Sequence, residues 1–439
     1  MTPLPRLIAL AAAATLTIAA ADPQPQTLIH GARVFDGTGK PAKVQDVLIR
    51  GDRIVKVGKR IRVKDATVVE AGGLTLIPGL HDLHIHTGSE AFASAEAITA
   101  AYRPYLASGI TSVNEYSVSG EMMAGIRALK ADVPHIALAQ RLGVPGGHGT
   151  ESAFTSGITL QVTNPAEAHA AMAKALPYKP DVIKVFADGW RYGDPNRPDR
   201  PSMDEPTLAA IVEDAHRAHI PVVTHTVTLA GDKIAAEAGV DSVVHGVGDA
   251  VVDDELIALM KRHKMAYVST LAVYEPQETR QLLPEEWKLL DATAQARENF
   301  RRSRGPEGVP DYDARRWAFL QENIRRLKAA HIPIGVGTDT GIGGVYPGFA
   351  AIREMRILVQ LGFTPAEALA AGTSVSAKIM HQERDHGTIK RGMRADLVLI
   401  GGKPDQDILD IYKVRRVWVS GKDVTATALA APPVPVATQ

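Results

Sequence analysis

The sequence predicts an α/β protein made of a (β/α)8 TIM barrel and a small β-sandwich that is built from both ends of the chain. Two observations support this fold class. Between residues 80 and 338, short apolar runs alternate repeatedly with helix-patterned stretches. On both sides of this region, β-like runs are punctuated by glycine, as hairpins require. The chain of 439 residues is long enough for one large domain and a smaller one.

Residues 1–21 predict a signal peptide. Arg6 precedes an apolar stretch at 7–21 that ends in three alanines. The stretch is shorter than the roughly 20 residues of a membrane-spanning helix, and small residues lie where a signal peptidase cuts. A retained anchor is the alternative. We therefore expect an exported protein, periplasmic or secreted, with no membrane attachment after cleavage.

The β-sandwich is expected to combine residues 27–79 with residues 387–425. The tail, 426–439, is rich in proline and alanine and is predicted to be disordered. The β-like runs that predict the sandwich strands are 28–35, 46–58, 396–400 and 414–422.

Residues 80–386 are expected to form the barrel. The connection from Leu271 to Ala330 is longer than a normal crossover, and such a long connection after a strand often acts as a lid. The eight predicted strands are Leu80–His86, Ile110–Tyr116, His135–Arg141, Val182–Phe186, Pro221–His225, Ser242–His245, Ala266–Thr270 and Ile334–Thr338.

Composition excludes several classes of function. Lys and Arg number 49 and so do Asp and Glu, so the chain has no basic excess to attract nucleic acid. The chain contains no Cys, which excludes a disulfide framework, a thiolate nucleophile and a Cys-bound zinc. The expected partner is a small-molecule or dipeptide-like substrate. The sequence allows a homo-oligomer without specifying one.

His84 and His86 form a His-x-His pair on the first predicted strand. Because a strand repeats its facing every two residues, both imidazoles point the same way, as two ligands of one metal must. The pair alone is as compatible with chance as with a metal site. Three further candidates, however, end other predicted strands, where barrel enzymes carry their chemistry: His225, His245 and Asp339.

Lys184 interrupts the apolar fourth strand and shares the barrel-facing side with Phe186. A bare ammonium group at that place would be costly to desolvate. Two solutions are open: a paired carboxylate, or carboxylation by carbon dioxide, which makes an anionic carbamate able to bridge two cations.

Together these residues resemble the metal-ligand set of the amidohydrolase superfamily. The resemblance covers nearly all of the chain after the signal peptide, and residues 387–398 are similar to the superfamily's return into its sandwich. It implies two divalent metal ions, usually zinc. It assigns one ion to His84, His86 and Asp339, the other to His225 and His245, and a bridging position to carboxylated Lys184.

The expected chemistry is hydrolysis of an amide carbon–nitrogen bond by a hydroxide shared between the two ions. Asp339 would take its proton and deliver it to the leaving nitrogen. The alternative is a lactone or cyclic-amide hydrolase. Deamination fits less well, because the superfamily's deaminases generally use one metal and lack the bridging Lys. A binding protein on a degenerate barrel would lack ligands, and the sequence lacks none.

The motif Gly146-Gly147-His148-Gly149 and the segment 238–246 resemble one branch of the superfamily, which contains prolidase-like dipeptidases, carboxypeptidases and ochratoxin amidases. His148 would there donate a hydrogen bond to the substrate or to the developing oxyanion. The chain departs from the branch at Val227, where many relatives have Tyr or His. One substrate contact is therefore missing.

Substrate-binding candidates lie in two loops. Arg191 or Tyr192 could bind a carboxylate and Trp190 could form an apolar wall, while Tyr274 is a further candidate after the seventh strand. The histidines and arginines that we assign to ordinary helix ends and loops are Arg197, Arg200, His216, His219, His381 and His386.

Overall fold

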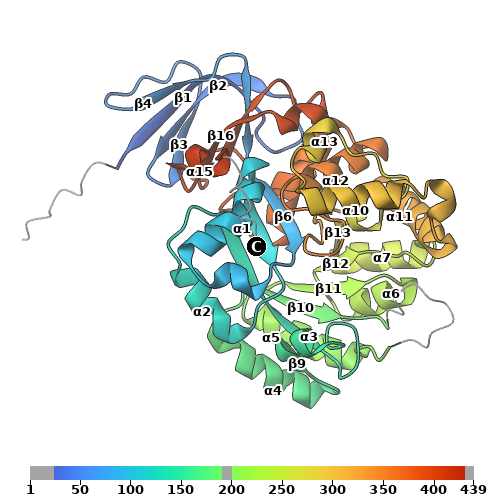
Figure 1. The fold of residues 1–439 in the computed structure, drawn as a ribbon. Coiled ribbons are helices and arrows are strands. Elements are labelled where there is room, and N and C mark those ends of the chain that lie inside the picture. Colours follow the sequence, from blue (N-terminus) through green and yellow to red (C-terminus); the bar gives the residue numbers. More distant parts are fainter. Residues whose placement is uncertain (1–23, 190–199, 431–439) are drawn as a thin grey trace, which may run out of the picture.

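The computed structural model describes residues 24–189 and 200–430. A barrel of eight parallel strands is surrounded by helices, and strands from both ends of the chain, blue and red in Figure 1, form a second sheet beside it. The predicted fold class is therefore confirmed. The predicted signal peptide, Trp190, Arg191, Tyr192 and residues 431–439 lie outside the described residues.

The barrel strands follow one another in chain order around the sheet, apart from the short strand β9 (Thr159–Gln161), which pairs with β8. Residues just after the eighth strand close the barrel: the Asp339 N–H donates to His84 O at 2.8 Å, and the His86 N–H donates to Thr340 O at 2.7 Å. The strands are β6 (Leu80–Ile85), β7 (Ile110–Glu115), β8 (His135–Gly143), β10 (Val182–Phe186), β11 (Val222–Thr226), β12 (Ser242–His245), β13 (Ala266–Ser269) and β14 (Ile334–Val336).

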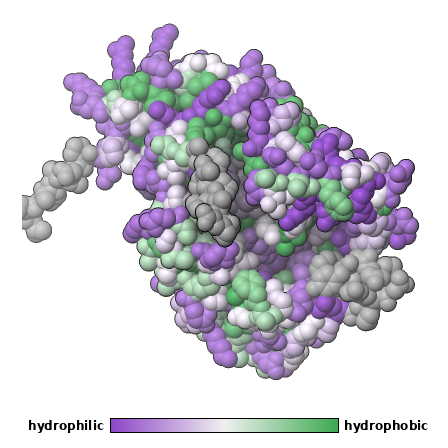
Figure 2. Space-filling model, viewed as in Figure 1, coloured by the Kyte–Doolittle hydropathy of each residue, from purple (hydrophilic) through white to green (hydrophobic). Residues whose placement is uncertain are grey.

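The outer helices pack apolar faces on the barrel and turn hydrophilic faces to the solvent, which dominate the surface in Figure 2. Local signals set their ends. In α7, the Asp253 side chain accepts from Leu256 N–H, and Lys264 ends the helix in the left-handed conformation. The helices around the barrel are α1 (Ala95–Ala107), α2 (Gly120–Ala128), α4 (Pro165–Ala175), α5 (Glu205–Arg217), α6 (Leu229–Glu237), α7 (Asp254–His263), α11 (Asp311–Ala329), α12 (Phe349–Gln360) and α13 (Pro365–Ala370).

The second sheet is mainly antiparallel and brings the two ends of the chain together, since β5 pairs with β15. Its own core includes the buried Trp418 and Ile49. The helix α15 (Thr425–Ala428) follows the last strand, so the prediction of disorder from residue 426 is wrong up to residue 430. The strands are β1 (Gln26–Val34), β2 (Lys43–Arg50), β3 (Arg53–Gly58), β4 (Thr67–Glu70), β5 (Leu74–Pro78), β15 (Leu397–Gly401), β16 (Val414–Val419) and β17 (Lys422–Asp423).

Within residues 24–189 and 200–430, every helix is too short or too polar to cross a bilayer. The predicted domain boundaries after residues 79 and 386 stay predictions.

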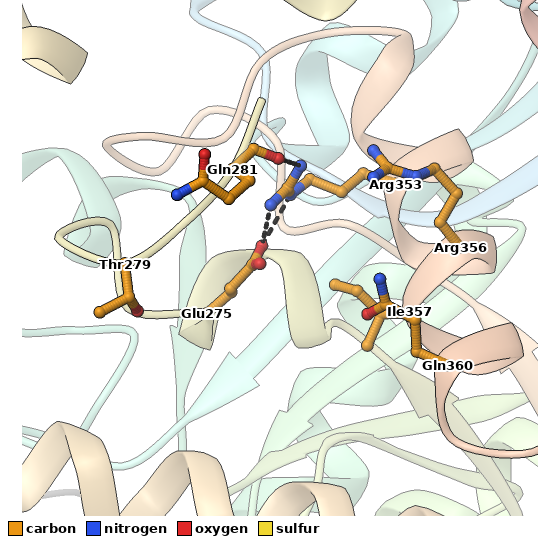
Figure 3. Close-up of a pocket in the computed structure, with 7 residues that line it drawn as sticks. All are labelled: Glu275, Thr279, Gln281, Arg353, Arg356, Ile357 and Gln360. Atoms are coloured by element: carbon orange, nitrogen blue, oxygen red, sulfur yellow. Dashed lines mark hydrogen bonds and ion pairs between the residues drawn. The ribbon is translucent and has the colours of Figure 1, made fainter. Parts of the chain in front are cut away.

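The long connection after β13 is tied to two later segments of the barrel. In the first contact, the Tyr346 hydroxyl of the loop after β14 donates to Glu298 at 3.0 Å, and Glu298 also forms a buried ion pair with Arg280 inside the connection. Figure 3 shows the second contact, where Arg353 of α12 pairs with Glu275 at 2.6 Å beside a cavity of about 170 Å³. The connection contains α8 (Leu271–Tyr274), α9 (Pro284–Trp287), α10 (Ala292–Arg302) and α11.

The pair of Arg280 with Glu298 predicts a measurable effect on stability. Because both side chains are almost fully buried, Glu298→Ala leaves an uncompensated guanidinium and should lower the free energy of unfolding by about 3–5 kcal/mol. The exposed pair of Arg217 with Glu213 offers a control, and Glu213→Ala should change the free energy of unfolding by less than about 1 kcal/mol. Denaturant unfolding measures both. Equal effects of the two substitutions would contradict a stabilising role for the buried pair.

Candidate metal centre

His84, His86 and Asp339 meet at the carboxyl end of the barrel. The Nε2 atoms of the two imidazoles lie 3.2 Å apart, and Asp339 Oδ1 lies 3.3 Å from His84 Nε2 and 3.1 Å from His86 Nε2. The first and eighth strands are neighbours at the closure of the barrel, which explains this convergence. Three ligand atoms of the types that zinc prefers thus surround one point.

His245 and His225 lie on the opposite side of the same cluster. The ring centroid of His245 is 5.0 Å from that of His84 and 4.6 Å from that of His225. Ligand atoms of His84, His245 and Asp339 all lie within 4.8 Å of one another. The structure therefore brings together four predicted histidine ligands and the predicted aspartate.

Burial keeps the imidazoles of His84, His225 and His245 neutral. It lowers the pKa of His245 to about 3 and lowers the pKa values of His84 and His225 well below 6.5, with neighbouring positive groups adding to the effect. Burial acts in the opposite direction on Asp339, but His245 and the hydrogen bonds from His84 and His86 outweigh it and lower the pKa of that carboxyl group. Neutral imidazoles beside an ionised carboxylate are the protonation states that metal binding requires.

Lys184 is buried in β10 with a relative exposure of 2%, and its Nζ has no hydrogen-bond partner within the described chain. Nζ lies 5.2 Å from the centre of the Tyr116 ring. Burial lowers the pKa of Lys184 to about 7, with the Arg141 charge adding to that effect and the Asp339 charge opposing it. The first of the two solutions considered above, a paired carboxylate within ion-pair distance, is not found among the described residues.

Two of the candidate ligands have strained backbones. His245 has φ 78° and Asp339 has φ 61°, in the left-handed region that most residues avoid. Such conformations cost on the order of 1–3 kcal/mol each and cluster at functional sites. Here they turn the chain away from β12 and β14 at the point where the side chains converge.

Neighbouring hydroxyl groups orient two of the histidines. His86 Nδ1 lies 2.9 Å from Ser117 Oγ, and His245 Nδ1 lies 2.9 Å from Thr270 Oγ1. With Nδ1 engaged in a hydrogen bond, Nε2 is left for a metal ion, which is the usual arrangement around zinc.

His148 lies beside the cluster in the glycine-rich loop after β8. Its ring centroid is 4.1 Å from that of His225, and its Nδ1 lies 2.8 Å from Glu151 Oε1. The carboxylate at Nδ1 orients the ring beside the cluster.

The role predicted for His148 has a direct test. If its Nε2–H stabilises negative charge that develops on the substrate, His148→Asn should lower kcat by about 10²-fold with little change in KM. His169→Asn, on the outer helix α4, serves as the control and should keep full activity. An unchanged kcat for His148→Asn would contradict the role.

A cavity of about 540 Å³ opens over these residues. Aromatic and aliphatic side chains form much of its wall, including Tyr274, whose ring centroid is 5.9 Å from that of His245. Two of the apolar lining residues, Phe154 and Ile342, are about half exposed. Tyr274 thus lines the cavity, and it stays a predicted substrate contact, while Arg191, Tyr192 and Trp190 lie outside the described residues.

Several residues at the site were not identified from the sequence. Asp188 Oδ1 lies 3.7 Å from His225 Nε2, and the other carboxylate oxygen accepts the Val227 N–H. Asp188 follows the fourth strand by two residues, a position at which its carboxylate could have been noted. Ser117 and Thr270 carry no comparable signal, because a hydroxyl residue after a strand is common.

Comparison with known proteins agrees with this geometry. A sequence model described as the amidohydrolase family matches residues 75–424. A dihydroorotase of Lactococcus lactis subsp. lactis (strain IL1403) is 36% identical over 86 residues, 20% of each chain. An N-acyl-D-aspartate deacylase of Alcaligenes xylosoxydans xylosoxydans is 36% identical over 97 residues, 22% of this chain and 18% of the relative. The matches span about a fifth of the length of these curated relatives.

Solved structures resemble the whole chain. A protein assigned as a prolidase from Bifidobacterium longum has a TM-score of 0.73 at 25% identity, with 92% of this chain and 95% of the other covered. A Xaa-Pro dipeptidase with bound methionine in its active site has a TM-score of 0.72 at 25% identity, with 91% and 100% covered. The ochratoxinase of A. niger shares the fold, with a TM-score of 0.72 at 23% identity and coverage of 92% and 96%.

Proposed function

Since this chain belongs to the amidohydrolase family, we propose that it is a metal-dependent hydrolase which cleaves the carbon–nitrogen bond of a peptide-like substrate or an N-acyl amino acid. The observation that carries the proposal is the convergence of His84, His86 and Asp339 within 3.3 Å of one another inside the cavity. Two imidazoles and a carboxylate at these distances form the kind of donor set that binds a divalent cation.

The residues fit two divalent cations. His84, His86 and Asp339 would hold one, and His225 with His245 would hold the other. The unpartnered Nζ of Lys184 supports a carbamate at that position, because a buried amine that is uncharged near neutral pH can react with carbon dioxide, and the product could contact both ions. Zinc suits this nitrogen and oxygen donor set.

Bound cations of this kind supply Lewis acidity and lower the pKa of water. Side chains of this protein would transfer the protons and bind the substrate oxygen. Asp339 lies where it can accept a proton from water and pass it to the leaving nitrogen, because its Oδ1 faces the same point as His84 and His86. His148 would donate to the substrate oxygen from the cavity wall.

The substrate class is inferred from the cavity and from the relatives. The cavity is large enough for a dipeptide-sized molecule, and its apolar walls suit a hydrophobic side chain. The names of the relatives include a dipeptidase and an N-acyl amino acid deacylase. These features favour amides of amino acids over other carbonyl compounds.

The proposal is tested with purified protein and a substrate panel. Dipeptides with Xaa-Pro and Xaa-Arg sequences and N-acyl amino acids should be hydrolysed, and a chelator should remove the activity until zinc is added back. Elemental analysis should find about two metal ions per chain. Hydrolysis confined to lactones or cyclic amides would favour the alternative, and full activity of the metal-free protein would refute the proposal.

A further inference from the structure

Arg141 lies among the candidate metal ligands but takes no part in the chemistry described above. It is the third residue from the end of β8, and its main chain pairs with that of Lys184 in β10. Ala139, two residues earlier, belongs to the core inside the barrel. Since strand residues alternate, Arg141 also faces the interior, and it lines the cavity with a relative exposure of 5%.

The guanidinium group has no carboxylate partner among the described residues. It donates to Gly149 O at 2.9 Å and more weakly to Tyr116 O at 3.5 Å, and its Nε has no partner. Of its five N–H groups, three are therefore left over. Two other buried arginines are neutralised, Arg280 by Glu298 and Arg353 by Glu275 and Glu286.

An unpaired charge is expensive to bury and is usually found where a ligand supplies the counter-charge. Burial lowers the pKa of Arg141 only to about 10, so the group stays positive at neutral pH. The acidic groups nearby are already engaged, since Glu151 contacts His148 and Asp339 contacts His84 and His86. One further anionic group, supplied by a ligand, would therefore balance the charge of Arg141.

The position of the guanidinium suits recognition of a planar anion. The Phe186 ring lies 5.2 Å from its Cζ and the Gly149 carbonyl fixes one side, so the remaining N–H groups have a defined direction. A guanidinium fork pairs with a carboxylate through two parallel hydrogen bonds.

We propose that Arg141 binds the carboxylate of the substrate and is the residue by which the enzyme selects amino-acid-derived amides over neutral ones. The inference rests on the proposed function and adds to it the chemical feature that the substrate must carry.

The test compares an N-acyl amino acid with its C-terminal primary amide, which has the same scissile bond but no carboxylate. The wild-type protein should prefer the acid by about 10- to 100-fold in kcat/KM. For the acid, Arg141→Gln should lower kcat/KM by about the same factor, mainly by raising KM; for the amide, its kcat/KM should change by less than about threefold. Arg141→Lys keeps the positive charge but not the guanidinium fork, so its kcat/KM on the acid should lie between those of the wild type and Arg141→Gln.

Arg316→Gln is the matched control. Arg316 is also buried without a carboxylate partner among the described residues, but it stacks on Tyr274 and Tyr312 and is not part of the cavity lining. Its replacement should affect acid and amide equally. If Arg141→Gln lowers kcat/KM equally for the acid and the amide, Arg141 only holds the Gly149 loop in place and the inference is overturned.

Two further outcomes separate the inference from the proposed function. A wild-type protein that hydrolyses amide and acid equally well would overturn the role of Arg141 while leaving amide hydrolysis intact. A wild-type protein that hydrolyses neither would refute the proposed function itself. If thermal unfolding shows that Arg141→Gln does not fold, the test relies on Arg141→Lys. A ratio of kcat/KM for the acid to kcat/KM for the amide that equals that of the wild type would overturn the inference.

Discussion

Lys184→Ala is expected to abolish hydrolysis, lowering kcat by at least about 10³-fold, which corresponds to about 4 kcal/mol of activation free energy. The Lys184 side chain lines the same cavity as the four histidines, and we propose that its amine becomes an anionic bridge, so its loss should also remove one cation. Steady-state kinetics and elemental analysis measure both effects, and the metal content should fall from about two ions per chain to about one.

Two variants control for indirect effects. Lys184→Met keeps the length of the side chain without the amine, and because Nζ has no partner it should not lower the melting temperature of the metal-free protein. Lys174→Ala, on the exposed face of α4, should keep full activity and metal content. Full activity of Lys184→Ala would exclude a bridging role for this residue.

Asp339→Asn is expected to lower kcat by about 10²- to 10⁴-fold, the range typical for loss of a general base. An amide can neither accept the proton nor supply the negative charge opposite His84 and His86. The substitution should leave the fold intact, because Asn tolerates the left-handed backbone that Asp339 adopts at φ 61°. Kinetics on the best substrate of the panel, with metal content determined in parallel, measures the effect.

The matched control is Asp254→Asn on α7. The Asp254 side chain is 96% exposed and forms only a surface ion pair with Arg326, so the variant should match the wild type in kcat and stability. An Asp339→Asn protein that retains both metals and wild-type kcat would remove Asp339 from the proposed mechanism.

The barrel could be predicted because its signals are local. Runs such as 182–186 and 242–245 are apolar and short, and the helices between them repeat their apolar residues at helical spacing. The predicted strands differ from the observed ones by two residues or fewer at either end, which is where hydrogen bonding rather than composition sets the boundary.

The grouping of the candidate ligands could also be predicted. In a parallel barrel the carboxyl ends of all strands lie at one end, so residues as distant as His84 and Asp339 must approach each other. The resemblance to a known family then implied how they divide between two ions. Their distances, and the hydroxyl groups of Ser117 and Thr270 that orient two of the rings, came only from the structure.

Arg141 shows the limit of prediction from sequence. A charged residue near the end of a strand is usually solvated, and a single arginine carries no signal of its partners. Only the folded barrel shows that this arginine is 5% exposed, and that within the described chain its Nε has no hydrogen-bond partner. The same holds for the connection after β13, whose length suggested a lid and whose Glu275 and Glu286 pair with Arg353 of α12.

The fold class, the end of the barrel where the candidate ligands gather and the types of side chain present there were predictable without a structure, because periodicity and residue type act over a few neighbouring positions. Which of these side chains meet, and which lack an ion-pair partner among the described residues, became clear only from the folded chain. Burial and pairing depend on groups far apart in the chain. Within the described chain, Lys184 and Arg141 are both buried and neither forms an ion pair, which is why their roles emerge only from the folded barrel.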